Sequence, residues 1–599
     1  MKNSFIIKFC LAIKQAFNDN RLGYSFWILL ISLNGILCYY EYIYLESSMN
    51  IAYIFTNSIS DSITSNFDYF WITIKPIIIL MIIFFINNRI MIISNYIRLY
   101  LSKVLNTSHD FRLTNRLANI HWENYEKCDV SNKISLIKNE GTNAYESLNN
   151  NFVFWIITIL TNLSIYLIYI ARIEWWIPLF FLIMAIVYIF IGIICGNKVY
   201  KNYVDTEIIR KKRTYLYNAT KAKDSHQDAI VNRLYNYITP KWKDLNDQWS
   251  NKNIASNMRK NYYSLIPDLV YAIIMCSVLY MSVVEIKTGT KEIGYVVTLI
   301  GITVALGVKL KDFSFSFGGY VKDAKIYGDY LNILNIENEN SDLENYLSDK
   351  YVVEFKNVTY LYPQSSHKAL DGLNFKFKNN EIISLIGHNG SGKTTFVNLL
   401  IELTKKYEGD ITVNGNSINK KLGILRKNCI CIFQDFTNYQ LTIKENIILG
   451  NGMEDVEDDE IWDVLNKVGI KEYVEKLPNN INTMLGQIEK GIDLSKGQWQ
   501  RLAIARMMIN KKAKIWILDE PTAHLDPIAE IELYNLVREF KNDKTIFFIS
   551  HRLGFSKNAS RIVVFKGGKI VEDSTHNELI KDVNSEYYKM YEKQKKWYE

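Results

Sequence analysis

The sequence predicts a multidomain membrane protein, in which an all-α transmembrane domain of six helices precedes an α/β domain. The first observation is a set of six apolar segments in the N-terminal half, because a membrane helix needs about 20 such residues. The second is a glycine-rich motif in the C-terminal half, between an apolar run and a helix-compatible segment. The third is composition: 48% of the 599 residues are hydrophobic and 14% are aromatic, in a chain too long for one core.

The six apolar segments are each predicted to form one membrane helix. They are Tyr24–Tyr44, Phe70–Ile93, Phe152–Ala171, Trp175–Cys195, Tyr262–Val284 and Ile293–Val308. Glycines and polar residues dilute the last segment, so a buried soluble helix stays an alternative there. Before the first segment, Met1–Arg21 alternates apolar and basic residues, which favours a helix lying on the inner membrane surface and not a cleavable signal.

The net charge of +8 is compatible with a nucleic-acid partner or with membrane orientation. Basic residues crowd the long connections Arg89–Asn151 and Asn197–Lys260, whereas Leu45–Tyr69 contains no Lys or Arg. Because cytoplasmic loops of membrane proteins carry an excess of Lys and Arg, the asymmetry favours a multi-pass membrane protein and no nucleic-acid partner. Both connections, both termini and the α/β domain are expected in the cytoplasm.

The seven cysteines are dispersed, and several lie inside apolar segments. Only Cys429 and Cys431 are close in sequence, and in a strand their side chains face the same side. This pattern predicts reduced, packing thiols without a metal site.

The glycine-rich motif runs from Gly387 to Thr394 and matches G-x-x-x-x-G-K-[ST]. Glycines allow the backbone to approach a polyphosphate, and successive N–H groups and the following helix N-terminus point at it. Lys393 is expected to reach the outer phosphates, and the Thr394 hydroxyl is expected to hold Mg²⁺. The motif therefore predicts a P-loop nucleotide-binding domain.

Four further features follow the motif in a fixed order. Gln434 follows an apolar run, Leu494–Gln498 (Leu-Ser-Lys-Gly-Gln) opens a helical pattern, and Ile515–Glu520 is a buried-strand run that ends in two carboxylates. Asp526 and His551 complete the set. With these companions the sequence resembles the ATP-binding-cassette (ABC) superfamily over essentially all of Tyr351–Glu599.

The resemblance implies ATP and Mg²⁺ as cofactors and assigns a role to each matching residue. Glu520 is expected to be the general base, while His551 and Gln434 position the attacking water. Asp519, Thr394 and Gln434 are expected around the metal. The expected nucleotide contacts are Tyr362, Gly387, Asn389, Gly390, Ser391, Gly392, Lys393, Thr394, Thr395, Ser495, Gly497, Gln498 and Asp526. Tyr360 is an alternative to Tyr362 for stacking on adenine.

The segment Leu494–Gln498 resembles the family signature, which closes over the ATP of a partner subunit. One chain has one cradle and one signature, so the resemblance implies a dimer; a homodimer is the simpler expectation and a heterodimer stays open. Lys496 stands where the family usually has glycine. A lysine is acceptable there if its φ is negative, so ATPase activity is expected to persist.

The whole chain resembles an exporter-type half-transporter. The resemblance implies a transmembrane domain at residues 1–335, a linker at 336–350 and a cassette at 351–599. It also implies two short cytoplasmic coupling helices, which are expected near Asn115–Lys127 and Tyr215–Ser225. Such a protein would be an ATP hydrolase coupled to transport across the lipid bilayer by alternating access.

The segments Gln434–Thr442 and Gly497–Arg501 resemble the cassettes of bacterial lantibiotic and related peptide exporters. The expected substrate is therefore a small peptide, and a lipid or multidrug exporter of the same fold is the alternative. About twenty residues precede Tyr24, which leaves no room for a cysteine-peptidase domain. Leader cleavage, where it is needed, is expected to require a separate peptidase.

Overall fold

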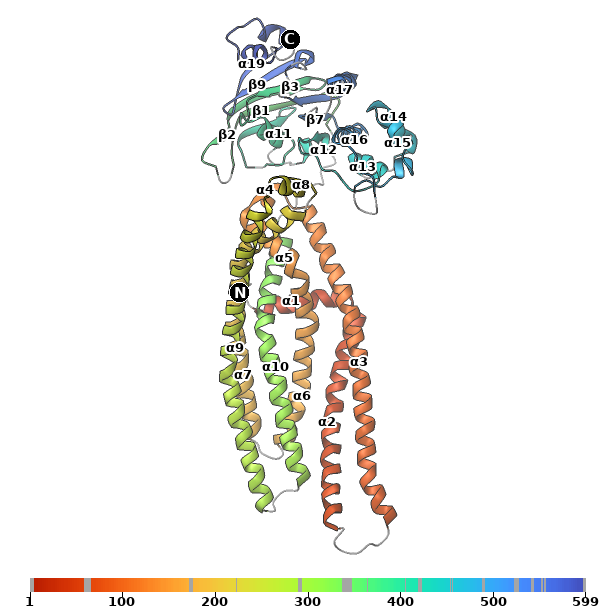
Figure 1. Cartoon of the computed structure of the whole chain (residues 1–599), viewed down its shortest axis with the longest axis vertical. Helices are drawn as coiled ribbons and strands as arrows, with labels where there is room; N and C mark the ends of the chain where they lie inside the picture. The colour runs from red at the N-terminus through yellow and green to blue at the C-terminus, as the bar shows by residue number, and fades with distance from the viewer. Residues whose placement is uncertain are drawn as a thin grey trace. The chain divides into compact units, whose positions relative to one another are not determined.

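The computed structural model describes residues 5–58, 66–171, 176–221, 223–288, 293–336, 347–362, 365–404, 406–418, 423–452, 454, 456–486, 491–521, 527–539, 543–550, 553 and 556–595. These residues form two compact units, which Figure 1 draws along the chain from red to blue. The first unit is helical and the second combines strands and helices. Each unit is described by itself below.

The helical unit is dominated by five long helices that form a bundle (Figure 1). Its α-helices are α1 (Phe5–Asp19), α2 (Arg21–Ser58), α3 (Asn66–Ala118), α4 (Trp122–Glu126), α5 (Cys128–Glu146), α6 (Val153–Ala171), α7 (Trp176–Lys221), α8 (Lys223–Val231), α9 (Tyr235–Thr288) and α10 (Ile293–Leu334). A π-helical turn, Ser147–Phe152, joins α5 to α6. Helix α10 packs against α7, α5, α2 and α9, so it is the central element of the bundle.

Among the described residues, four helical segments are long and apolar enough to cross a membrane. They are Arg21–Ile54, Ile74–Ala118, Phe181–Lys221 and Asp268–Thr288, and they overlap four of the six predicted spans. The other two predictions, Phe152–Ala171 and Ile293–Val308, fall on α6 and α10 but are not among the four. The count of six spans therefore stays a prediction.

Two short helices, α4 and α8, lie within the long connections of the helical unit. Helix α4 lies inside the predicted range Asn115–Lys127. Helix α8 begins at Lys223, eight residues after the start of the predicted range Tyr215–Ser225, because α7 continues to Lys221. Both helices overlap the predicted ranges, and their role as coupling helices stays a prediction.

Helix α1 lies across the bundle (Figure 1). Apolar contacts attach one end of α1 to the bundle and polar contacts attach the other. Phe5 and Phe9 pack on Phe152, with ring centroids 5.5 and 4.6 Å apart. At the other end of α1, Arg112 donates two hydrogen bonds to the Asp19 carboxylate, at 2.7 and 2.9 Å. The Tyr145 hydroxyl also donates to Asp19, at 3.2 Å, so three elements meet at one carboxylate.

Two contacts between polar side chains join neighbouring helices of the bundle. The Lys311 ammonium on α10 lies 2.9 Å from the Asp268 carboxylate on α9. The Asn87 amide on α3 donates to Glu41 on α2 at 2.8 Å. Because an unpaired charge at membrane depth is costly, these contacts tie specific helix pairs together.

We expect Arg112→Ala to destabilise the helical unit by about 3 kcal/mol, because Asp19 is only 11% exposed and loses its main counter-charge. The apparent melting temperature of the purified full chain in detergent measures the effect. The double variant Asp19→Asn with Arg112→Gln should recover most of the loss. Additive losses in a double-mutant cycle would contradict a direct coupling of the two side chains.

The second unit is built on two sheets. The six-stranded sheet has the order β10-β9-β3-β8-β7-β6, in which all neighbours are parallel except β10 and β9. Its strands are β3 (Ile382–Gly387), β6 (Cys429–Ile432), β7 (Ile515–Asp519), β8 (Thr545–Ile549), β9 (Arg561–Lys566) and β10 (Lys569–Ser574). The antiparallel sheet has the order β2-β1-β4-β5 and contains β1 (Val352–Leu361), β2 (Lys368–Lys378), β4 (Glu408–Val413) and β5 (Asn416–Ser417).

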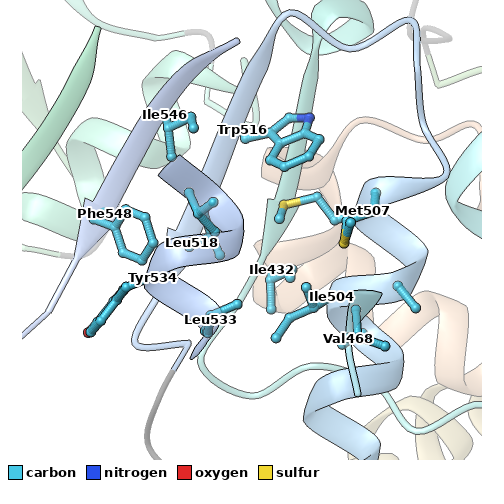
Figure 2. Packing of buried hydrophobic residues seen from close by; sticks show 14 of the residues in the cluster. Ile432, Val468, Ile504, Met507, Trp516, Leu518, Leu533, Tyr534, Ile546 and Phe548 are labelled. Carbon is cyan, nitrogen blue, oxygen red and sulfur yellow. The ribbon is translucent and has the colours of Figure 1, made fainter. Parts of the chain in front are cut away.

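Helices cover the six-stranded sheet and shape the rest of this unit. They are α11 (Lys393–Leu400), α12 (Ile424–Asn428), α13 (Ile443–Ile448), α14 (Asp458–Lys467), α15 (Lys471–Glu475), α16 (Lys496–Met508), α17 (Pro527–Glu539), α18 (His576–Leu579) and α19 (Glu586–Lys595). Figure 2 shows one core, where Trp516 and Leu518 of β7 pack beside Ile504 and Met507 of α16. Strands β3, β7 and β8 are buried along their whole length, so the residues at their ends are held in place by packing.

Candidate nucleotide-binding and hydrolysis site

The phosphate cradle is the turn that joins β3 to α11. Gly392 is the residue before the helix and has φ 109°, and Gly390 has φ 75°. A Cβ on Gly392 would lie 2.8 Å from the Ala369 carbonyl oxygen, so glycine is required there both by conformation and by space. The turn therefore presents bare backbone at the N-terminus of α11.

Lys393 is buried and folds back over this turn. Its Nζ donates to the carbonyl oxygens of Gly387 and His388, at 2.7 and 3.1 Å. Burial lowers the pKa of the Lys393 ammonium, whereas the carboxylates of Asp519 and Glu520 act in the opposite direction. The Ser391 hydroxyl is buried and has no hydrogen-bond partner among the described residues.

The two acids stand where β7 ends. Asp519 is the last residue of the strand and is 7% exposed, so burial and the adjacent Glu520 raise the pKa of its carboxyl to about 6, against the effect of Lys393. Glu520 has φ 48°, an unusual conformation for a residue with a side chain, and its N–H donates to the Ile549 carbonyl of β8 at 2.9 Å. The Gln434 amide donates to Glu520 Oε2 at 2.8 Å.

These elements enclose a cavity of about 540 Å³. It is lined by Tyr362, Ala369, Asn389, Gly390, Ser391, Gly392, Lys393, Thr394, Thr395, Gln434, Asp519, Glu520 and Ile549. The Tyr362 hydroxyl is 3.2 Å from the Thr395 hydroxyl, whereas Tyr360 is only 3% exposed. Of the two tyrosines, Tyr362 is the one with a face available to a ligand.

The signature segment lies at the N-terminus of α16, and its residues are not among those that line this cavity. Ser495 precedes α16 and forms a reciprocal cap with Gln498: the Gln498 N–H donates to Ser495 Oγ at 3.2 Å, and the Ser495 N–H donates to Gln498 Oε1 at 2.9 Å. Lys496 is the first residue of α16 and has a negative φ, as its replacement of glycine requires. Ser495, Gly497 and Gln498 do not line the cavity of their own chain.

The structure brings together most of the residues that the sequence singled out. Gly387 ends β3 directly before the cradle, and Asp526 and His551 lie outside the described residues. Sequence reasoning missed Ala369 and Ile549. Ile549 could have been found as the end of a buried strand beside β7, but Ala369 reaches the cradle from β2 by long-range packing alone.

The residues that line the cavity fit a nucleoside triphosphate. A glycine turn, a helix N-terminus, a buried ammonium and an unpartnered hydroxyl converge on one cavity, and each favours phosphate oxygens. The Thr394 hydroxyl, the Asp519 carboxylate and the Gln434 amide are oxygen donors of the kind that Mg²⁺ prefers. The described residues contain no group of three His, Cys, Asp or Glu side chains placed for a metal.

Comparison with known proteins agrees with this site. Residues 370–523 match the ABC transporter family. The nisin transport ATP-binding protein of Lactococcus lactis subsp. lactis is 26% identical over 86% of this chain and 87% of its own length. The subtilin transport ATP-binding protein of Bacillus subtilis is 27% identical over 79% and 77%, and a β-(1→2)glucan export ATP-binding/permease protein of Bartonella bacilliformis is 28% identical over 70% of each chain.

The fold matches that of a bacterial Atm1-family ABC exporter with ATP bound, with a TM-score of 0.81. The match covers 96% of this chain and 99% of the other at 16% identity, so it compares folds alone. The chain is an ABC exporter with an N-terminal membrane domain and a C-terminal cassette. It is an ATP-hydrolysing transporter and a multi-pass membrane protein.

The raised pKa of Asp519 makes the nucleotide-free cassette less stable as pH rises. The folded state holds the Asp519 proton up to about pH 6 and the unfolded chain releases it near pH 4, so stability is lost between these values. We expect Asp519→Asn to raise the melting temperature of the nucleotide-free full chain at pH 7.5, by the equivalent of about 2–3 kcal/mol.

The gain should disappear near pH 4, where both side chains are neutral. The matched control is Asp435→Asn, an exposed acid in the same unit, which should leave the melting temperature unchanged at both pH values. An equal gain at both pH values would show that packing, and not charge, distinguishes the two side chains.

Proposed function

We propose that this exporter uses ATP to move a small peptide from the cytoplasm to the outside of a bacterial cell. The observation that carries the proposal is the similarity to the nisin and subtilin transport proteins, which extends over most of each chain and is not confined to the cassette. The segments Gln434–Thr442 and Gly497–Arg501 support it, because both resemble peptide-exporter cassettes.

The proposed hydrolytic step rests on Glu520 as general base. Glu520 already accepts a hydrogen bond from Gln434, so its carboxylate is oriented within the cavity that the cradle closes. Lys393 supplies a buried positive charge for the outer phosphates, and His551 is proposed to position the attacking water. A bound Mg²⁺ would supply charge neutralisation of the phosphate oxygens, held by Thr394, Asp519 and Gln434.

The proposed working unit is a dimer. Ser495, Gly497 and Gln498 lie at a helix N-terminus but do not line their own chain's cavity, so they are available to the ATP of a second subunit. Asp526 is proposed to bridge the paired cassettes. All of Lys393, Gln434, Glu520 and His551 are present, so both sites of a homodimer would be competent; a heterodimer is the alternative.

The orientation and boundaries also belong to the proposal. The charge asymmetry of the connections supports cytoplasmic termini and a cytoplasmic cassette. The transmembrane domain is proposed at residues 1–335, the linker at 336–350 and the cassette at 351–599. Short helices α4 and α8 are the candidates for coupling helices, and a separate peptidase is the proposed partner for leader removal.

A second candidate function is the export of a different substrate class. The Bartonella relative is named as a glucan exporter. The alternative from the sequence is a lipid or multidrug exporter of the same fold. The cassette does not discriminate among these substrates, because its residues contact nucleotide.

We expect Glu520→Gln to bind ATP but to lose at least about 10²-fold in turnover, because an amide fills the same space and cannot accept the proton from water. ATPase activity and retained nucleotide of the purified protein measure the two effects. Glu460→Gln, an exposed acid of the same unit, is the matched control and should turn over normally. Hydrolysis at the unmodified rate in Glu520→Gln would contradict the role of Glu520 as general base.

Peptide export is tested by ATP-dependent uptake into inside-out vesicles that contain the purified exporter. A synthetic lantibiotic-type precursor should accumulate with ATP and not with Glu520→Gln, and mass spectrometry should find it at full mass. Uptake of a lipid analogue or a dye, with no uptake of any peptide offered, would overturn the substrate class. A shortened peptide would overturn the assignment of leader removal to a separate peptidase.

A further inference from the structure

A second cavity, of about 230 Å³, lies in the helical unit between α7 and α9. It is lined by Cys195, Lys198, Val199, Asn202, Asp205, Lys252, Ala255, Ser256 and Arg259. Three of these side chains are cationic and one is anionic, so the cavity carries an excess of positive charge. Asn202 and Ser256 add neutral hydrogen-bonding groups, and the Asn202 amide donates to Asn253 of α9 at 3.0 Å.

The cavity lies where the apolar parts of both helices end. The apolar run of α7 ends at Cys195, and Lys198 follows within one helical turn, about 5 Å along the axis. The apolar run of α9 begins at Tyr262, and Arg259 precedes it by the same interval. The basic side chains are therefore placed at the depth where acyl chains give way to headgroups.

The position of helix α1 is a second indication that the cavity lies at the depth of the membrane interface. Gly196, beside the cavity, packs closely against Gly318 and Val321 of α10. The residue before Gly318 on α10, Phe317, packs on Phe5 of α1, with ring centroids 5.7 Å apart. The outward side of α1 exposes apolar residues, including Ile6 at 67%, as a helix lying in the membrane interface does.

From these observations we propose that the α7–α9 cavity binds the phosphate-bearing headgroup of an anionic phospholipid of the inner leaflet. Lys198 and Arg259 are placed to meet the phosphate, and Lys252 adds charge on the same side. The volume is smaller than that of a typical drug-sized pocket, which suits a headgroup whose acyl chains stay outside in the bilayer. Basic pockets between membrane helices on the cytoplasmic side recognise lipid headgroups in this way.

The test compares two triple variants of equal charge. The first replaces Lys198, Lys252 and Arg259 by Gln, and the control replaces Lys201, Lys212 and Lys243, which are exposed on the same two helices and do not line the cavity. Native mass spectrometry of the detergent-purified full chain, incubated with phosphatidylglycerol or phosphatidylcholine, counts the lipids that each protein retains.

We expect the unmodified protein and the control to retain phosphatidylglycerol over phosphatidylcholine, and the cavity variant to bind it about tenfold more weakly. Asp205→Asn should strengthen retention, because it removes the one acid among the described lining residues. This opposite change keeps the proposal testable if the triple variant folds poorly.

Three results would overturn the proposal. Equal losses in both triple variants would show that general basic charge, and not this cavity, attracts the lipid. Displacement of the lipid by inorganic phosphate at constant ionic strength would indicate a site for free anions. Weaker retention in Asp205→Asn would contradict the assigned electrostatics.

Discussion

The buried Lys393 ammonium beside two adjacent carboxylates is the interaction on which the cassette depends. Burial of Asp519, together with the charge of the adjacent Glu520, raises the pKa of the Asp519 carboxyl. One ammonium opposes two carboxylates, and it is also tied to the carbonyl groups of its own turn. The excess of negative charge favours an additional cation beside the two acids, while the ammonium and the glycine turn favour phosphate oxygens.

The central strands of the six-stranded sheet hold the two acids close to the phosphate cradle. Strand β8 lies between β3 and β7, so the cradle and the acid pair are held at the same edge by parallel registers. Glu520 leaves this edge with a positive φ and a backbone hydrogen bond to Ile549, which directs its carboxylate towards Gln434. In the helical unit, by contrast, Asp19–Arg112 and Asp268–Lys311 are ion pairs of opposite charges between helices.

The cassette site was largely predictable because its chemistry requires fixed residues at fixed spacings, as in Gly387–Thr394 and Ile515–Glu520. The fold class was predictable from apolar runs, but the start of α8 was not, because no helix-breaking residue marks where α7 ends. Ala369 and the α7–α9 cavity were missed for another reason. Their residues meet through packing between segments distant in sequence, and a single sequence carries no signal for such contacts.

The central claim is that two chains complete each ATP site, with the cradle of one and the signature of the other. We suggest mixing two cysteine-free Glu520→Gln proteins, one carrying Asn389→Cys and the other Ser495→Cys, under oxidising conditions. The account predicts a disulfide-linked dimer that forms with ATP and only in the mixture. Cross-linking that is independent of ATP, or no cross-linking in a preparation shown to bind ATP, would contradict it.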